Sequence, residues 1–253
     1  MKKIQNPADE IIEQEGEMSF LEHLEELRWR ILYLLIGVTL GTILSWIFID
    51  FLIDNILLLP AKKAKLNLQN LRPFGQLFIY FQVAVIGGFI LSVPNVFYQL
   101  WKFISPALKK NERKYVSRIV IFSSICFLAG ITFAYYVMLP LTLTFAGQFG
   151  TTLIENNFAI DEYFSIIISV MLAAGVIFEL PMLSFFLTKL GILTPNFMRK
   201  YRKHSIVGIL IVAAILTPGT DPVAQILLAI PLFLLYEISI FVSKFSLKKN
   251  IET

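Results

Sequence analysis

Residues 163–188, YFSIIISVMLAAGVIFELPMLSFFLT, decide the class of this protein, because the run is long, apolar and carries a single charged side chain, Glu179. A helix needs about 20 apolar residues to cross the hydrocarbon core of a bilayer, which is roughly 30 Å thick. This run exceeds that length. We therefore predict that it forms a membrane-spanning helix.

Comparable runs along the chain predict one polytopic membrane domain, residues 1–253, that is all-α and has six transmembrane helices. The predicted spans cover residues 31–53, 74–100, 115–139, 163–188, 205–216 and 223–242. The last two are short, and the fifth reaches about 18 Å. These two spans can form either two short crossing helices, which we favour, or a re-entrant hairpin.

The composition supports a membrane protein, since 57% of the residues are apolar, 16% are charged and the mean hydropathy is +0.72. Soluble domains average about 45–50% apolar residues and about 25% charged residues. Proline removes a backbone donor and kinks a helix. Four prolines in or beside the spans therefore predict bent helices that form a cupped wall: Pro94, Pro140, Pro181 and Pro231.

Lysine and arginine placement predicts that both termini are cytoplasmic, including the segment 1–30 and the tail 244–253. The predicted cytoplasmic segments hold Lys2, Lys3, Arg28, Arg30, Lys102, Lys109, Lys110, Arg113, Lys114, Arg118, Lys189, Arg199, Lys200, Arg202, Lys203, Lys244, Lys248 and Lys249. The opposite side holds Lys62, Lys63, Lys65 and Arg72. This bias explains the net charge of +4 without a nucleic-acid partner, since no basic stripe with stacking aromatics is present.

The sequence offers no chemistry for an enzyme or a cofactor site. It lacks the G-x-S-x-G, H-E-x-x-H and phosphate-loop patterns. One cysteine and two histidines leave little material for a metal or haem. We expect no metal and no cofactor.

The most informative feature is a cluster of carboxylates just before the first span. Eight of the eighteen acids fall between residues 9 and 26, although anionic lipid repels them there. Ser19 and Glu22 have capping-box spacing and predict a helix start. An apolar stripe at helical spacing follows, and Glu22, Glu25 and Glu26 lie on the remaining face. The stripe comprises Leu21, Leu24, Leu27 and Ile31, and Trp29 is placed to anchor the membrane interface.

These acids allow two interpretations. Glu22 can cap the helix while Glu25 and Glu26 form a solvated face. Alternatively, Glu25 or Glu26 receives a cationic ligand, and Glu112 is the second carboxylate for a pair of arginines. Glu112 can also pair locally with its basic neighbours.

Two further acids are predicted to lie in or near the bilayer. Glu179 is placed near the bilayer midplane, where an acid marks a polar interior, a pathway, a partner contact or a bond to a neighbouring helix. Glu237 is expected at the cytoplasmic edge, reaching the interface or pairing with Lys244.

Four segments resemble the TatC family, the receptor subunit of the twin-arginine protein translocase. They are Phe20-Leu21-Glu22-His23-Leu24-Glu25-Glu26-Leu27-Arg28, the stretch from Gln99-Leu100-Trp101-Lys102-Phe103-Ile104-Ser105-Pro106-Ala107-Leu108 to Asn111-Glu112-Arg113, Phe178-Glu179-Leu180-Pro181, and Leu216-Thr217-Pro218 followed by Asp221. The resemblance covers about residues 19–245. It implies a receptor that binds the twin-arginine signal peptides of folded cargo and nucleates a translocase driven by the proton gradient.

The resemblance also implies site residues and partners. Glu26 and Glu112 would receive the two arginines, with Glu25, Arg28, Phe103 and Arg113 shaping the same site. Glu179, Gln225, Gln99 and Thr217 would face the bound signal or the single-span partner subunits, and Pro60 and Asp221 would be structural. The turn that carries Asp221 varies in length among family members, so its role is left open.

The expected partners also include lipid and other copies of the chain. The expected location is the bacterial cytoplasmic membrane, or a thylakoid or mitochondrial inner membrane. The competing function is a polytopic transporter or channel for a small solute, although the chain lacks the internal repeat that such folds usually carry.

Overall fold

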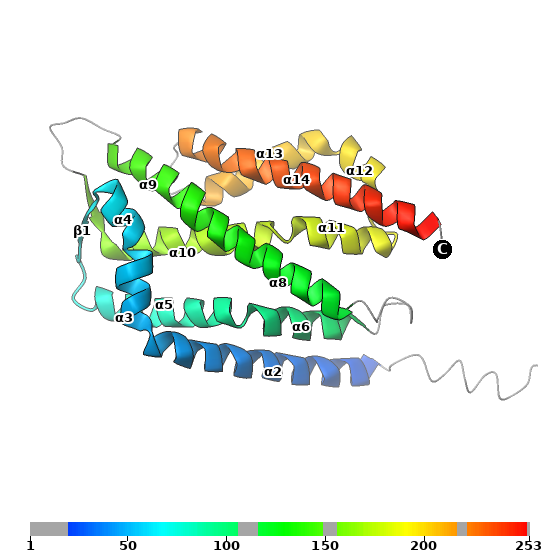
Figure 1. Ribbon diagram of the computed structural model, residues 1–253, viewed down its shortest axis with the longest axis horizontal. Helices are drawn as coiled ribbons and strands as arrows, with labels where there is room; N and C mark the ends of the chain where they lie inside the picture. Colours follow the sequence, from blue (N-terminus) through cyan, green and yellow to red (C-terminus); the bar gives the residue numbers. More distant parts are fainter. Residues whose placement is uncertain (1–19, 106–115, 149–155, 217–221, 252–253) are drawn as a thin grey trace, which may run out of the picture.

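The computed structural model describes residues 20–105, 116–148, 156–216 and 222–251, and these residues are mostly helical (Figure 1). The elements in chain order are α2 (Phe20–Ile47), α3 (Ile49–Phe51), the π-helix η1 (Leu52–Leu57), α4 (Leu59–Ala64), β1 (Asn67–Gln69), α5 (Gly75–Leu91), α6 (Val93–Ile104), α8 (Val116–Phe133), the π-helix η3 (Ala134–Met138), α9 (Leu139–Gln148), β2 (Asn157–Ala159), α10 (Ile160–Ile177), α11 (Leu180–Lys189), α12 (Pro195–Lys200), α13 (Arg202–Leu216) and α14 (Pro222–Ile251).

The helices pack side by side along one direction. Helix α2 contacts α5 and α6, α10 contacts α8, and α11 contacts α14. In Figure 1, α8 and α9 run obliquely across the other helices. One end of the molecule holds the N-terminal end of α2, the C-terminal ends of α6 and α11 and the start of α8 (Figure 1). We call it the basic end, because the last turns of α6 and α11 carry Lys102 and Lys189.

The helices confirm the predicted class, a helical membrane protein. Three segments are long and apolar enough to cross a bilayer, and the bent pair α5 and α6 provides a fourth. The three segments are Leu21–Ile47, Ser117–Gln148 and Ile160–Lys189. Helix α13 has 15 residues and so reaches about 22 Å. The number of crossings stays a prediction.

Two helix ends differ from the apolar runs that predicted them. Helix α2 ends at Ile47, and residues 48–53, predicted to complete the first span, belong to the segment from α3 to η1 that turns away from it (Figure 1). Helix α14 runs for 30 residues, past residue 242. Helical hydrogen bonding does not stop where apolar character stops, so hydropathy locates the span better than the helix end.

A sharp bend of the helix axis occurs at one of the four prolines, irregular helical backbone precedes two others, and the kinks at those two stay predictions. Pro94 is the second residue of α6, and the axis bends by 56° between α5 and α6. Pro181 is the second residue of α11, after the break at Phe178 and Glu179. Pro140 follows the π-helix η3. At Pro231, by contrast, the helical assignment of α14 continues.

At the end opposite the basic end, a buried tyrosine hydroxyl forms hydrogen bonds with backbone groups of η1 and α4. The Tyr163 hydroxyl donates to the carbonyl oxygen of Leu57 at 2.7 Å and accepts from the amide of Ala61 at 3.0 Å. Pro60, whose structural role stays a prediction, is buried and lies between Leu57 and Ala61 in the chain. Strands β1 and β2 pair in parallel beside this turn, with Leu68 opposite Phe158.

Helices α2 and α5 approach so closely that two facing positions tolerate no side chain. A Cβ atom on Gly88 would lie 2.3 Å from the backbone nitrogen of Thr42, and one on Gly41 would lie 2.5 Å from the carbonyl oxygen of Gly88. The nearby Ser92 hydroxyl donates to the carbonyl of Gly37 at 2.8 Å. Such small-residue contacts are typical of helix pairs in membranes.

A buried hydroxyl seam joins α11 and α14. The hydroxyls of Thr188 and Ser243 lie 2.6 Å apart, and the Ser184 hydroxyl donates to the Ser239 carbonyl at 3.1 Å. All four residues are buried. Hydrogen bonds between helices satisfy groups that lipid cannot.

We predict that Gly88→Ala lowers the stability of the protein by about 1–3 kcal/mol, because the new methyl group collides with the backbone of α2. The measurement is the thermal unfolding midpoint of the purified protein in one detergent. Gly208→Ala is the matched control, since a Cβ there meets nothing within 4 Å. Equal midpoints for the two variants would contradict the close approach of α2 and α5.

Candidate functional site

The first turns of α2 and the last turns of α6 meet at the basic end. They carry the residues of the predicted peptide site that fall within the described ranges. Glu26 and Arg30 are four residues apart on α2 and therefore share one face of the helix. Gln99 and Phe103 share a face of α6 in the same way. Because α2 and α6 are in contact, these two faces can interact.

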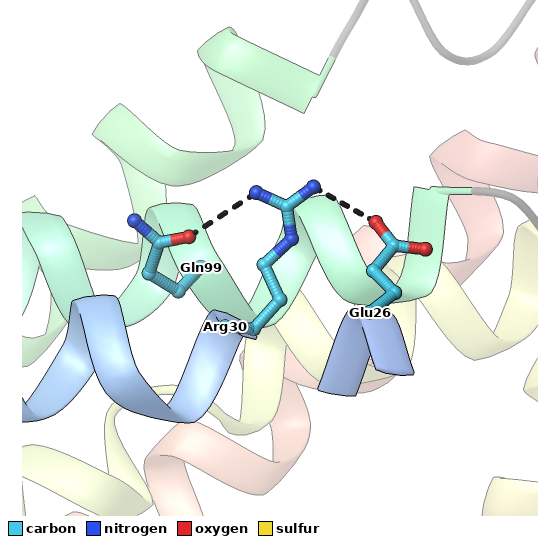
Figure 2. A network of polar contacts seen from close by, with 3 residues as sticks. All are labelled: Glu26, Arg30 and Gln99. Atoms are coloured by element: carbon cyan, nitrogen blue, oxygen red, sulfur yellow. Dashed lines mark hydrogen bonds and ion pairs between the residues drawn. The ribbon is translucent and has the colours of Figure 1, made fainter. Parts of the chain in front are cut away.

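The polar contacts centre on Arg30, which joins the two helices (Figure 2). Its Nη2 donates to Oε1 of Glu26 at 2.8 Å, and its Nη1 donates to Oε1 of Gln99 at 3.4 Å. Both charged side chains are 18% exposed. An ion pair shielded to this degree is screened less by salt than an exposed pair.

The network continues from Gln99 along α6 and back to α2. Gln99 Nε2 donates to Oδ1 of Asn95 at 3.3 Å, and Asn95 Nδ2 donates to the carbonyl oxygen of Tyr33 at 3.3 Å. Arg30 is thus linked through two amide side chains to the backbone of its own helix. We call Glu26, Arg30, Gln99 and Asn95 the polar ladder.

The polar ladder is incomplete at two atoms. Oε2 of Glu26 and Nε of Arg30 are buried and have no hydrogen-bond partner among the residues that the structure describes. Figure 2 shows Oε2 directed away from Arg30. Buried polar atoms are nearly always paired in folded proteins, so an open acceptor on a charged group marks a candidate ligand contact.

An aromatic pair adjoins the polar ladder on the same two helices. The rings of His23 and Phe103 stack with centroids 4.5 Å apart and an interplanar angle of 18°. His23 precedes Glu26 by three residues, and Phe103 follows Gln99 by four. The stack therefore lies on the ladder side of both helices and joins the start of α2 to the end of α6.

The structure places the other predicted residues of the peptide site as follows. Glu25 and Arg28 are exposed on α2, and Phe103 is half-buried. Glu112, Arg113, Thr217 and Asp221 lie outside the described residues, as does Ser19, although α2 begins at the next residue. The predicted apolar stripe faces outward, with Leu21 at 75% exposure, as a lipid-facing surface does.

Gln99 is a buried member of the polar ladder, and its predicted contact with the bound signal or partner subunits stays a prediction. Sequence reasoning missed Arg30, His23 and Asn95 as site residues. The spacing of Glu26 and Arg30 was a usable signal, because acid and base four residues apart pair on a helix. The contacts across α2 and α6 had no such signal.

Glu179 lies at the break between α10 and α11, beside Ser123 and the backbone of Phe127 on α8. Its Oε1 and the hydroxyl of Ser123 are both buried, and the Ser123 hydroxyl and the Phe127 amide are the donors nearest to the carboxyl in the described ranges. Glu179 thus lies between neighbouring helices, and the role of its carboxyl stays a prediction.

Gln225 lies where α14 meets α13, and its Nε2 donates to the carbonyl oxygen of Leu210 at 2.9 Å. An apolar groove of about 300 Å³ runs beside it between the same two helices. Glu237 accepts from Nη2 of Arg202 at 2.5 Å. Of the two alternatives expected for Glu237, pairing with Lys244 gives way to pairing with Arg202 on the neighbouring helix, and its position at the cytoplasmic edge stays a prediction.

Within the described part of the chain, no three side chains of the His, Cys, Asp and Glu types come together as metal ligands do. The arrangement at the basic end instead offers one negatively charged hydrogen-bond acceptor, the Glu26 carboxylate, and an aromatic surface. These groups suit a cationic ligand with planar, directional N–H donors, such as a guanidinium.

A family model described as Sec-independent protein translocase protein (TatC) matches residues 22–231. The chain is 36% identical to the Sec-independent protein translocase protein TatC of Carboxydothermus hydrogenoformans over 92% of this chain and 95% of that protein. It is also 36% identical to the chloroplastic protein TATC of Pisum sativum, over 91% of this chain and 65% of the relative.

Solved structures agree with these relatives. The crystal structure of the twin arginine translocase receptor TatC superposes with a TM-score of 0.79 at 36% identity, covering 89% of this chain and 99% of that one. A second crystal structure of that receptor, in DDM, has the same TM-score and covers 88% of this chain. The helical packing described above is therefore shared with proteins of known structure.

We predict that Phe103→Ala speeds amide hydrogen exchange over residues 20–30, since loss of the stack with His23 removes about 1 kcal/mol that holds the start of α2. Exchange is measured by mass spectrometry on protein in nanodiscs. Phe122→Ala is the control, because Phe122 is 61% exposed on α8. If both variants exchange at the rate of the parent, the stack does not hold this helix end.

Proposed function

The chain belongs to the TatC family, and from that premise we propose that it is the receptor of a twin-arginine translocase. In this role it binds the twin-arginine signal peptides of folded cargo proteins at its basic end, which faces the cytoplasm. It is a multi-pass membrane protein and not an enzyme. The alternative of a small-solute transporter or channel is not supported by the relatives.

The observation that carries the proposed binding site is the open carboxylate oxygen of Glu26. This oxygen is buried and has no partner among the described residues, yet it belongs to a group fixed by Arg30. Arginine donates through a rigid fork that matches carboxylate oxygens, and shielding from water strengthens the attraction. A signal-peptide guanidinium therefore binds at Oε2 of Glu26.

The second arginine of the signal peptide is assigned to Glu112. Helix α6 ends at Ile104, so the chain leaves α6 beside α2 only eight residues before Glu112. Phe103 and His23 form an aromatic wall on the Glu26 side of the site in this proposal. The exposed Glu25 and Arg28 on α2 form its rim, and Arg113 is proposed to adjust the local charge with them.

The remaining site residues are proposed to contact the rest of the translocase. Glu179, at the broken helix, and Gln225, beside the apolar groove of α13 and α14, contact single-span partner subunits in this proposal, as does Thr217, which lies between α13 and α14 in the sequence. Pro60 and Asp221 have structural roles, and copies of the chain associate with each other. We also propose six crossings, with both termini on the cytoplasmic side.

A photoreactive twin-arginine peptide tests this proposal in native membranes. We expect Glu26→Ala or Glu112→Ala to reduce crosslinking by about tenfold, the effect of losing one charge-assisted hydrogen bond. Lysine at either position should reduce it further, because like charges repel. Crosslinked product is measured on gels, normalised to the amount of inserted protein.

Glu237→Ala is the matched control, since Glu237 also pairs with an arginine but belongs to α14. It should crosslink as the parent does. Parental crosslinking by both Glu26→Ala and Glu112→Ala would sink the assignment of the two carboxylates.

A further inference from the structure

We propose that Arg30 is a positioning residue of the signal-peptide site. It holds the Glu26 carboxylate by one oxygen and presents the other oxygen to the guanidinium of the peptide. The inference rests on the proposed function and adds a residue that determines specificity. Arg30 does not contact the ligand in this scheme, because it acts through Glu26.

Arg30 is suited to this role because it is itself fixed at both ends. One terminal nitrogen donates to Glu26 and the other donates to Gln99 on α6. Asn95 then orients Gln99 and is bound to the carbonyl of Tyr33. Asn95 also packs tightly on α2, since a Cβ on Gly37 would lie 2.1 Å from its amide nitrogen.

The geometry of the ion pair favours a shared carboxylate over a displaced arginine. Arg30 donates one hydrogen bond, from Nη2 to Oε1 of Glu26, whereas a bidentate pair would occupy both carboxylate oxygens. The remaining oxygen points away from Arg30 (Figure 2). Expelling Arg30 would leave a guanidinium that is 18% exposed without its counter-ion, and breaking such a pair is strongly unfavourable.

A fixed carboxylate discriminates between cations. The N–H groups of a guanidinium point in set directions within one plane, so an acceptor held in one orientation matches them. The ammonium of lysine has three rotatable donors and binds a mobile carboxylate equally well. Arg30 therefore contributes to the preference for arginine over lysine, beyond the contribution of charge.

The test measures binding of two labelled peptides, one with paired arginines and one with paired lysines, to the full chain in nanodiscs by fluorescence anisotropy. We expect Arg30→Gln to weaken binding of the arginine peptide by about tenfold, the value of one charge-assisted hydrogen bond. The Kd of the lysine peptide should change by less than about threefold. The ratio of the lysine-peptide Kd to the arginine-peptide Kd therefore falls.

Arg30→Lys retains the charge but not the fork, so it should keep the unfolding midpoint of the parent and still lose part of the discrimination. Arg202→Gln is the matched control, because it breaks an arginine–glutamate pair away from the site, between α13 and α14. It should leave the affinities for both peptides unchanged. The unfolding midpoints of all variants show whether a loss of affinity reflects loss of folding.

The outcomes separate the inference from the function on which it rests. Tighter binding by Arg30→Gln would make Arg30 a competitor of the peptide and overturn the proposal. An unchanged ratio of the two Kd values, with or without weaker binding, would also overturn it. If Glu26→Gln binds the arginine peptide as the parent does, the proposed binding site fails, whatever Arg30 does.

Discussion

Lipid offers no hydrogen-bond partners, so each polar group in the membrane region must find one inside the protein. This constraint explains most of the described architecture. Tyr163 satisfies backbone groups between η1 and α4, and hydroxyls join α11 to α14. Glu26 at the basic end differs from these groups, since one oxygen of its carboxylate is buried without a partner in the described ranges. A buried polar atom without a hydrogen-bond partner costs free energy, so such atoms are expected where a ligand or partner binds.

The class of the fold could be predicted from sequence, because hydropathy reports directly on transfer into lipid. The family was also predicted, from the signature around Glu26 and the loop that begins at Gln99, and the family model confirms it. Helix ends were less predictable, as α2 and α14 show, because they depend on local hydrogen bonding. Pro94 and Pro181 predicted bends, but the sequence could not give the 56° between α5 and α6.

The candidate site was predicted only in part. The resemblance identified Glu26 and Phe103, and the structure brings their helices together, with His23 stacked on Phe103. In the sequence Arg30 is one of the charges that predict orientation, and its contact with Gln99 depends on how α2 packs against α6. Glu237 gives the same lesson, since its partner Arg202 comes from a neighbouring helix. Contacts between helices follow from tertiary packing, which the spacing of residues along one helix does not encode.

The central claim is a direct ion pair between Glu26 and one arginine of a signal peptide. Two double-mutant cycles test it most directly, each combining Glu26→Gln with a glutamine at one of the two arginines of the peptide and measuring the four Kd values of that cycle by calorimetry. We predict a coupling energy of about 1.5 kcal/mol or more with one of the two arginines, the range found for close charge pairs. Additive effects at both arginines would contradict the account.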